Sequence, residues 1–459
     1  MQISTLFKGR IIKNLPLLRE RVKNFKDYSL LVFCITSIEE LTTVIKEQEE
    51  RMQQLFRKER MISRDLIINP EKVGTGAANI IIGPRRCGKS VFALQLVNKE
   101  NFGYANFDDE RLNIKANELN KVLEAIYTLK GNVELIVFDE IQEVLGWERF
   151  VSRLVDSKRL IITGSNAKMM SKELATYMTG RHVDTELLPF GFAEFLDYKG
   201  FKKETSSVYT TSEKAKVVSF LKEYLEIGGF PLGIKLGKGY LADLYRDIIQ
   251  KDILQRHGVR MSEKLSALAR YLIVGSASEI SYNRLRNIFE IASKHTIQDW
   301  ISYMEQAYIL FKIERFSFKL KESIIAPKKI YAIDLGLMNM LVPEHDIGRT
   351  METAVAIELI RRKSYLKLGV QINYWKNQRH NEVDFVIRHE RKVLELIQVT
   401  YASTYTDINP REINRLLEAS VELRCNKLRI ITWDYEEKKR IEGKTIAFIP
   451  LWKWLLHKQ

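Results

Sequence analysis

The chain has 459 residues, 45% of them hydrophobic and 29% charged, and its formal net charge is +15 at pH 7. This length predicts roughly two to four domains with a sizeable core, and the composition is ordinary for a soluble protein. No apolar run approaches the ~18 residues of a membrane span, and the N-terminus lacks the apolar core of a signal peptide, so we expect no membrane association.

Charge and cysteine content narrow the class of protein further. A strongly basic protein often binds nucleic acid, because neutralising phosphates releases counterions; the alternative is that the surplus lysine only keeps the chain soluble. The three cysteines, Cys34, Cys87 and Cys425, are far apart and form no metal-binding pattern. A reducing, cytoplasmic location is therefore expected.

A charged helical segment near the N-terminus is followed by alternating strand and helix patterns. Residues 43–60 read as one long charged helix with a thin apolar stripe. From about residue 66 to residue 195, strand and helix patterns alternate, which predicts a parallel sheet with helices on both faces. The expected strands are 78–82, 104–107, 134–139 and 159–163.

A complete G-x-x-x-x-G-K-[ST] phosphate loop follows the first of these strands. It consists of Gly83, Pro84, Arg85, Arg86, Cys87, Gly88, Lys89 and Ser90. In such a loop, backbone N–H groups and the positive end of the next helix cradle the phosphates. Lys89 is expected to reach the β- and γ-phosphates and Ser90 to bind Mg²⁺.

The strand at 134–139 provides independent support for a nucleotide site, because it ends in two carboxylates, Asp139 and Glu140. In phosphate-loop enzymes an acid in this place holds the magnesium ion, and we assign that role to Asp139. Glu140 is then placed to polarise the attacking water. The alternative is a buried strand that ends in solvated acids. The pair predicts ATP hydrolysis rather than nucleotide binding alone.

Two residues and one short acidic segment in the predicted ATPase domain each allow two interpretations. Thr163 could sense the γ-phosphate between the acids and the water, or residues 163–166 could cap a helix that starts near Lys168. Residues 108–110, Asp-Asp-Glu, are either site acids or a helix-starting cluster. Arg181 could reach a phosphate in a neighbouring subunit, as an arginine finger does, or be a structural arginine.

The series of motifs resembles one family, the archaeal and bacterial AAA-type ATPases that carry a C-terminal domain of unknown function. The resemblance covers nearly everything after residue 40. It implies an AAA-like core, then a helical segment with a winged helix, then a nuclease-like α/β fold. The motifs that carry it are 83–90, 106–110, 138–142, 162–166, 179–181, 188–190, 192–195, 227–231, 245–254 and 331–336.

The pattern of the middle of the chain also predicts a winged helix, independently of the family resemblance. Residues 281–289 and 295–304 read as two helices joined by a polar turn, and 307–313 reads as a strand. This order presents a helix to a DNA major groove; the alternative is a rigid lid or a protein-docking element. The expected phosphate contacts are Arg284, Arg286, Lys294 and His295.

The C-terminal acids resemble the PD-(D/E)xK nuclease pattern only in part. Asp384 matches its first acid, but Gln398 stands at the second acid and Thr400 at the lysine. Threonine supplies no cation, and an amide is a poorer ligand than a carboxylate for a hard metal. We therefore expect a nuclease-like fold with weak or lost cleavage. Glu358 could still complete a metal site with Asp384, and an ordinary charged hairpin edge is the alternative.

Together these patterns predict an α/β fold, with a P-loop NTPase (AAA-like) parallel sheet followed by a helical and winged-helix region and a nuclease-like α/β domain. The expected divisions are an N-terminal basic extension (1–65), the ATPase domain (66–200), the lid and winged-helix region (201–320) and the C-terminal domain (321–459).

The predicted function is a cytoplasmic, Mg²⁺-dependent ATPase with ATP as ligand, DNA as its large partner and self-assembly into a homo-oligomer left open. Two alternatives are a nucleotide-controlled switch that binds a protein, and an ATP-gated nuclease using Glu358 and Asp384. A guanine-nucleotide switch is disfavoured, because no Asn-Lys-x-Asp element follows the loop.

Overall fold

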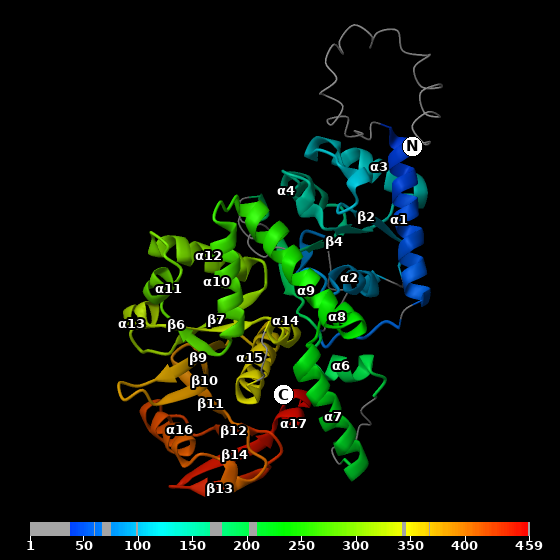
Figure 1. Cartoon of the computed structure of the whole chain (residues 1–459). Coiled ribbons are helices and arrows are strands. Elements are labelled where there is room, and N and C mark those ends of the chain that lie inside the picture. The colour runs from blue at the N-terminus through cyan, green and yellow to red at the C-terminus, as the bar shows by residue number, and fades with distance from the viewer. Residues whose placement is uncertain are drawn as a thin grey trace, which may run out of the picture.

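Two sheets organise the chain. The computed structural model describes residues 37–58, 60–66, 75–97, 100–165, 177–201, 209–341, 346–366 and 368–457. Within these ranges one sheet has five strands and the other nine. Figure 1 shows the five-stranded sheet and its helices in the upper part of the molecule, the nine-stranded sheet below it, and helices between the two. In the described ranges, no helix is long and apolar enough to cross a bilayer. Residues 1–36, most of the predicted N-terminal extension, lie outside them.

The first sheet is parallel throughout, as the sequence predicted. Its order is β2-β3-β4-β1-β5, and every neighbouring pair runs parallel. The strands are β1 (Ala78–Ile82), β2 (Phe102–Asn106), β3 (Leu135–Asp139), β4 (Arg159–Gly164) and β5 (His182–Glu186). The helices of this part are α1 (Ile38–Lys58), α2 (Lys89–Val97), α3 (Leu119–Lys130) and α4 (Glu148–Leu154).

Helices cover both faces of this sheet because its inner strands, β1, β3 and β4, carry runs of consecutive apolar residues. Val137 and Ile161 pack in one core with α2. Phe138 and Ile162, the next residue on each strand, pack in the other core with α1 and α3. Successive side chains of a strand point to opposite faces, so a continuous apolar run is the pattern of a strand buried on both sides.

A helical region follows the first sheet. Its helices are α6 (Phe192–Tyr198), α7 (Thr211–Ile227), α8 (Pro231–Leu236), α9 (Lys238–Asp247), a π-helical segment (Ile248–Gln255) and α10 (Ser262–Val274). The start of α7 is a capping box, in which Thr210 accepts from the Glu213 N–H and Glu213 accepts from the Thr210 N–H.

Next come three strands and three helices in the order β6, α11, α12, β7, α13, β8. Their bounds are β6 (Ser278–Ile280), α11 (Tyr282–Ile288), α12 (Lys294–Gln306), β7 (Leu310–Arg315), α13 (Leu320–Ile325) and β8 (Lys328–Ala332). The two predicted helices are present within a residue or two. The strand expected at 307–313 begins only at Leu310, because Tyr308 has a φ of +53° in the turn after α12.

The second sheet continues from this unit to the C-terminus, in the order β13-β14-β12-β11-β10-β9-β7-β8-β6. β8 pairs with β6 and β7, so the sheet crosses the expected division at residue 320. The remaining elements are α14 (Leu335–Met340), α15 (Ile347–Tyr365), β9 (Gln371–Lys376), β10 (Glu382–His389), β11 (Lys392–Val399), α16 (Pro410–Glu422), β12 (Leu428–Thr432), β13 (Glu437–Ile441), β14 (Lys444–Pro450) and α17 (Leu451–Leu456).

Two of the family-like motifs, 227–231 and 331–336, meet in space and are structural. The N–H of Gly229 donates to the buried carboxylate of Asp334 at 2.6 Å. A Cβ at Gly229 would lie 2.1 Å from the Phe190 carbonyl oxygen, so only glycine permits this approach. The contact ties the end of α7 to the start of α14.

A buried ion network joins the two halves of the molecule through Glu194, whose side chain is 1% exposed. Glu194 accepts from Arg64 Nε at 3.0 Å and from Arg361 Nη1 of α15 at 3.1 Å. It also accepts from the backbone N–H groups of Asp65 and Gly191. Burial alone would raise the pKa of Glu194, but the two guanidiniums outweigh it and lower the pKa.

Replacing Glu194 by glutamine should destabilise the protein by about 3–5 kcal/mol, because two arginines remain buried without their partner. Asp197→Asn is the control; its partner Arg60 is half exposed, so less than about 1 kcal/mol is expected. Urea unfolding measures both. The effect of Glu194→Gln should shrink as the pH falls below about 4.3, where unfolded glutamate takes up a proton. Equal effects of the two variants would contradict this role of Glu194.

Candidate functional site

The phosphate loop lies between β1 and α2, at the carboxyl edge of the parallel sheet. Ligands of such sheets bind at this edge. Lys89 and Ser90 are the first two residues of α2. The Lys89 ammonium is buried, donates to the Pro84 carbonyl oxygen at 3.0 Å and lies 3.5 Å from a carboxylate oxygen of Glu140. Arg86 has a φ of +65° and is exposed.

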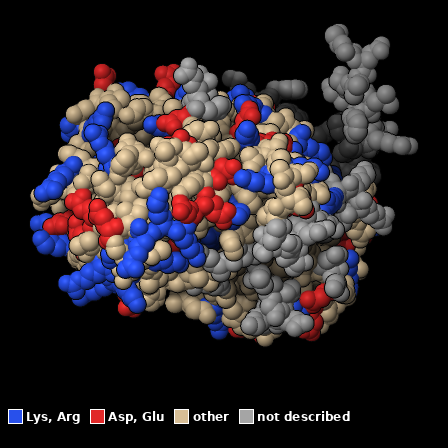
Figure 2. Space-filling model, turned by 90° about the horizontal axis from the view of Figure 1, so that it is seen from below, with Lys and Arg blue, Asp and Glu red and all other residues tan. Residues whose placement is uncertain are grey.

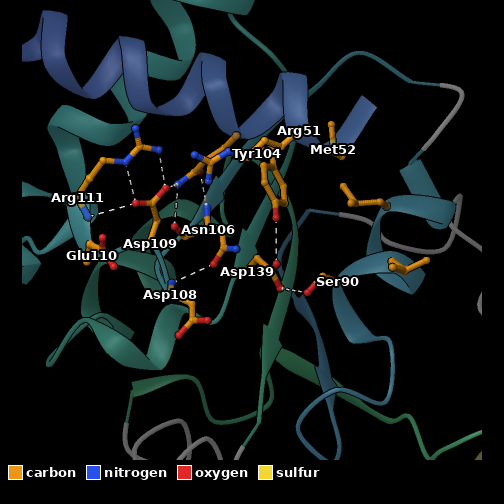
Figure 3. Close-up of a pocket in the computed structure, with 13 residues that line it drawn as sticks. Arg51, Met52, Ser90, Tyr104, Asn106, Asp108, Asp109, Glu110, Arg111 and Asp139 are labelled. Carbon is orange, nitrogen blue, oxygen red and sulfur yellow. Dashed lines mark hydrogen bonds and ion pairs between the residues drawn. The ribbon is translucent and has the colours of Figure 1, made fainter. Parts of the chain in front are cut away.

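Asp139 accepts three hydroxyl hydrogen bonds at the end of β3. Ser90 Oγ donates at 2.9 Å, Tyr104 OH donates at 3.0 Å, and Thr163 Oγ1 also donates. Figure 3 shows the first two of these bonds. Burial, and after it the neighbouring Glu140 charge, raise the pKa of Asp139. A cation beside this carboxylate would favour its charged form.

These groups fit Mg²⁺, which binds oxygen ligands and is usually held by one or two carboxylates together with substrate phosphates. The pair of Ser90 Oγ and Asp139, 2.9 Å apart, supplies such ligands. Among the described residues, no group of three or more His, Cys, Asp or Glu side chains could hold a metal. The donor set is that of a metal shared with a nucleotide rather than of a cage made by protein alone.

Glu140 stands in a strained conformation next to Asp139. Its φ is +53°, an uncommon value for a residue other than glycine. Its N–H donates to Thr163 Oγ1 at 3.0 Å, and Gln142 Nε2 donates to its carboxylate at 2.5 Å. Although burial works in the opposite direction, Lys89 lowers the pKa of Glu140, so the carboxylate is charged at neutral pH. Backbone strain of this kind is concentrated at functional sites.

Thr163 links the two acids, since it donates to Asp139 and accepts from the Glu140 N–H. The sequence suggested Thr163 as a γ-phosphate sensor between the acids and the water; in the structure it contacts both acids because β4 lies beside β3. The alternative, a cap for a helix near Lys168, concerns residues outside the described ranges.

A cavity of about 450 Å³ opens beside Ser90 and Asp139 and extends toward α1. Asp108, Asp109 and Glu110 all line it (Figure 3). Asp109 also starts a short helix, accepting from the Arg111 N–H and pairing with the Arg111 guanidinium at 2.9 Å. Both interpretations of the predicted acidic cluster therefore hold in part: its acids line the cavity, and Asp109 caps a helix.

Asp252 of the helical region contacts the phosphate loop, and Arg256 lies beside Asp252; sequence analysis missed both. Asp252 accepts two hydrogen bonds of 3.0 Å from Arg85 of the loop. Arg256, one helical turn later, lies 3.7 Å from Asp252. The signal for this contact in the sequence is that Asp252 belongs to the family-like motif 245–254. No local pattern gives its partner, because 167 residues separate Arg85 from Asp252.

Two further residues of the predicted site, Cys87 and Arg181, lie away from the Asp139–Glu140 pair. Cys87 is buried with its thiol 3.2 Å from the Leu187 carbonyl oxygen, and burial raises the pKa of that thiol. Arg181 immediately precedes β5, at the amino edge of the parallel sheet, and pairs with Asp156 at 3.1 Å. It therefore lies at the edge opposite to this chain's own phosphate loop.

The C-terminal acids are arranged differently from the expectation. Glu358 is bound by Arg361 and Arg362 of its own helix at 3.0 and 2.8 Å. Asp384 instead shares Lys329 with Glu352, which lies nearly two helical turns before Glu358. The predicted partnership of Glu358 with Asp384 is therefore wrong.

Comparison with known proteins divides the chain into three matched segments. Residues 75–196 match an AAA domain. Residues 219–347 match a domain of unknown function, DUF8612, and residues 347–454 match another, DUF4143.

Two relatives span nearly the whole chain. The uncharacterized protein MJ1544 of Methanocaldococcus jannaschii is 36% identical over 88% of this chain and 93% of its own length. An uncharacterized protein of Haemophilus influenzae is 27% identical over 82% of this chain and 94% of its own length.

Solved structures are matched only distantly. The Thermotoga maritima RuvB Holliday junction branch migration motor has a TM-score of 0.26 and 14% identity, with 60% of this chain and 88% of that one covered. A Signal Transduction ATPase with Numerous Domains from Pyrococcus horikoshii has a TM-score of 0.23 and 12% identity, with 67% and 51% covered.

Gly83→Ala should destabilise the protein by about 1–3 kcal/mol. Gly83 has a φ of +151°, and a Cβ there would lie 2.0 Å from the Leu187 carbonyl oxygen. Gly239→Ala in α9 is the control, because it meets nothing within 4 Å and should leave stability unchanged or slightly raised. Urea midpoints of the two variants test this. A Gly83→Ala midpoint equal to that of Gly239→Ala would show that the loop tolerates a side chain.

Proposed function

Because the chain belongs to the family of the uncharacterized protein MJ1544 and carries an AAA domain followed by two domains of unknown function, we propose that it is a Mg²⁺-dependent ATPase. Its nucleotide state would control the helical region and the second sheet. The observation that carries the proposal is the contact of Lys89, Ser90, Asp139, Thr163 and Glu140 at one edge of the parallel sheet.

Each of these side chains has one role in the proposed reaction. Lys89 exchanges its hydrogen bond to the Pro84 carbonyl for phosphate oxygens, and the loop N–H groups bind the same phosphates. Ser90 and Asp139 hold Mg²⁺, which when bound neutralises charge on the phosphate oxygens. Glu140 orients and polarises the attacking water, and Thr163 keeps the two acids in register.

Arg85 and Arg256 are held close to this site by Asp252. A γ-phosphate carries more negative charge than one carboxylate and accepts charge-assisted hydrogen bonds from guanidinium groups. We therefore assign Asp252 the role of a competitor for the phosphate. When ATP draws the arginines away, the π-helical segment that carries Asp252 loses its tie to the loop. This connects nucleotide state with the helical region.

Arg181 fits a contact between subunits better than one within the chain. It is 45% exposed and precedes β5, away from its own loop. In a homo-oligomer it would reach the nucleotide of a neighbouring copy, as an arginine finger does. A structural role through Asp156 remains the alternative.

DNA is the proposed large partner. The order α10, β6, α11, α12, β7, α13, β8, with β8 between β6 and β7 in the sheet, supports a winged helix. Arg284, Lys294 and His295 are exposed on it, whereas Arg286 is half-buried and donates to Asn287. On the face seen in Figure 2, Lys and Arg are dense on one side but mixed with acids, so net charge alone does not mark a binding groove.

The domain division and location follow the same proposal. We keep an ATPase domain at 66–200 and a nuclease-like domain at the C-terminus, and we place β8 with the winged-helix region because of its strand partners. A cytoplasmic location agrees with the two described cysteines, which are free and buried.

Intact protein should hydrolyse ATP with Mg²⁺, and Glu140→Gln should lower turnover by about 10²–10⁴-fold while ATP still binds. The matched control is Glu134→Gln, at the exposed amino end of the same strand, which should keep turnover. Phosphate release measures both, with and without duplex DNA. Stimulation by DNA that is lost at high salt supports DNA as partner; turnover indifferent to DNA favours a protein-binding switch. ATP binding without turnover would contradict the proposed hydrolysis.

Asp252→Asn should tighten ATP binding by about fivefold or more, because the arginines no longer have a carboxylate partner. The affinity is measured by equilibrium binding in a Glu140→Gln background, so that hydrolysis does not interfere. Asp247→Asn is the control, since its partner Lys251 is exposed. Unchanged or weaker ATP affinity in a folded Asp252→Asn protein would contradict the competition.

A further inference from the structure

Gln142 is a buried polar side chain that lies against Glu140, the acid proposed to polarise the attacking water. It closes the family-like motif 138–142 and is 6% exposed. Its Nε2 donates to Glu140 Oε2 at 2.5 Å, and the Lys89 ammonium lies 3.5 Å from the other carboxylate oxygen, Oε1. The carboxylate of Glu140 is therefore held between the lysine of the phosphate loop and the amide of Gln142.

The backbone fixes Gln142 in this place. Gln142 is the middle residue of a short 3₁₀ helix, Ile141–Glu143, in which the Glu143 N–H donates to the Glu140 carbonyl oxygen at 3.2 Å. Side chains two residues apart do not face each other in a regular helix. The left-handed φ of +53° at Glu140 changes the direction of the chain just before this helix, so the two side chains meet.

The amide of Gln142 has one end without a partner. An ionised carboxylate only accepts hydrogen bonds, so the Nε2 of Gln142 faces Glu140 and its Oε1 is the free end. Within the described part of the chain, this Oε1 accepts no hydrogen bond. Buried acceptors are almost always paired, so an unpaired oxygen beside the proposed catalytic acid indicates a donor that comes with the ligand.

Gln48 shows how a buried glutamine with a structural role is bonded. It is also 6% exposed, but both ends of its amide are paired. Its Nε2 donates to the Asn106 carbonyl oxygen at 3.0 Å and its Oε1 accepts from the Asn106 N–H at 2.9 Å, which ties α1 to β2. Gln142 uses only its donor end, so a structural role leaves half of its amide unexplained.

An attacking water offers the donor that the Oε1 of Gln142 lacks. Glu140 can accept one O–H of this water, because a carboxylate has about four acceptor positions. An acceptor for the other O–H fixes the orientation of the water and directs its lone pair at the γ-phosphorus. An amide side chain orients the attacking water in some phosphate-loop enzymes.

We propose that Gln142 is a catalytic residue of the proposed hydrolysis: its Oε1 accepts a hydrogen bond from the attacking water, while its Nε2 holds the carboxylate of Glu140. This inference rests on the proposed ATPase function. As the water oxygen forms its bond to the γ-phosphorus, the bond from that phosphorus to the bridging oxygen of ADP breaks, and one water proton passes to Glu140. Gln142 neither gains nor loses a proton; it orients the water.

Replacing Gln142 by methionine, which has a similar size but no amide, should lower ATP turnover by about 10²-fold, the cost of misplacing a reacting group by about 1 Å. The KM and the affinity for ADP should stay within about twofold of the parent's, because the amide acts on the water rather than on the nucleotide. The affinity for ADP with aluminium fluoride, which together mimic the transition state, should fall by a factor similar to that of turnover. Phosphate release and calorimetry measure these quantities.

Two further single variants and one double variant accompany this change. Gln142→Asn keeps the amide but is one methylene shorter, so its losses should be smaller than those of Gln142→Met. Gln306→Met is the matched control, because Gln306 is also partly buried and donates to Ser302 of its own helix, α12; it should keep parental turnover and analogue affinity. Adding Gln142→Met to Glu140→Gln should cost much less than the two single losses multiplied, since both residues act on one water.

A folded Gln142→Met protein with parental turnover or parental affinity for the analogue would overturn the role of Gln142, as would losses that multiply in the double variant. Melting temperatures show whether each variant is folded. If Gln142→Met is not, reduced turnover by Gln142→Asn supports the role and parental turnover overturns it. A parent that hydrolyses ATP no faster than its Gln142 variants refutes this inference alone, whereas a parent without turnover refutes the ATPase function and this inference together.

Discussion

The arrangement of the molecule depends on one buried carboxylate, Glu194, shared by two arginines. Arg64 uses its remaining donors on the carbonyl oxygens of Cys87 and Leu188, so the phosphate loop and the chain after β5 meet at a single guanidinium. Arg361 brings α15 to the same acid. A buried charge is tolerable only when paired and hydrogen-bonded, which means that the loop, the helical region and the second sheet must assemble together.

Three further buried ionic groups show how the same electrostatic requirement is met in different ways. At the phosphate loop, hydroxyl groups surround Asp139 and Lys89 approaches Glu140, an arrangement that a cation and phosphates can enter. At the π-helical segment, Asp252 serves two arginines. In the second sheet, three acids close around Lys329. In the proposed function the first group binds a ligand and the second exchanges its partner, whereas the third is paired within the chain.

This contrast favours the first sheet as the place of the proposed chemistry. Glu140 is charged, strained in its backbone and next in sequence to Asp139, which lines a cavity, as a group that acts on a ligand should be. The C-terminal acids are satisfied by lysine and arginine and are held by a continuous sheet. In the proposed function, the first sheet binds and hydrolyses ATP and the second transmits or presents the result.

The sequence by itself determined the parallel sheet and the candidate nucleotide site. Local patterns suffice there: an apolar run specifies each buried strand, and the residues that follow β1, β3 and β4 meet at one edge because parallel strands end together. The tertiary structure alone decided which distant charges pair. Asp252 reaches Arg85, Lys329 reaches Asp384, and Glu358 turns to Arg361 rather than to Asp384. The first two pairs are separated by 167 and 55 residues and leave no periodic signal, since the requirement to neutralise a buried charge selects a partner by proximity in the folded chain. Glu358 and Arg361 are three residues apart on one helix, but only the folded chain shows that Asp384 is not their neighbour.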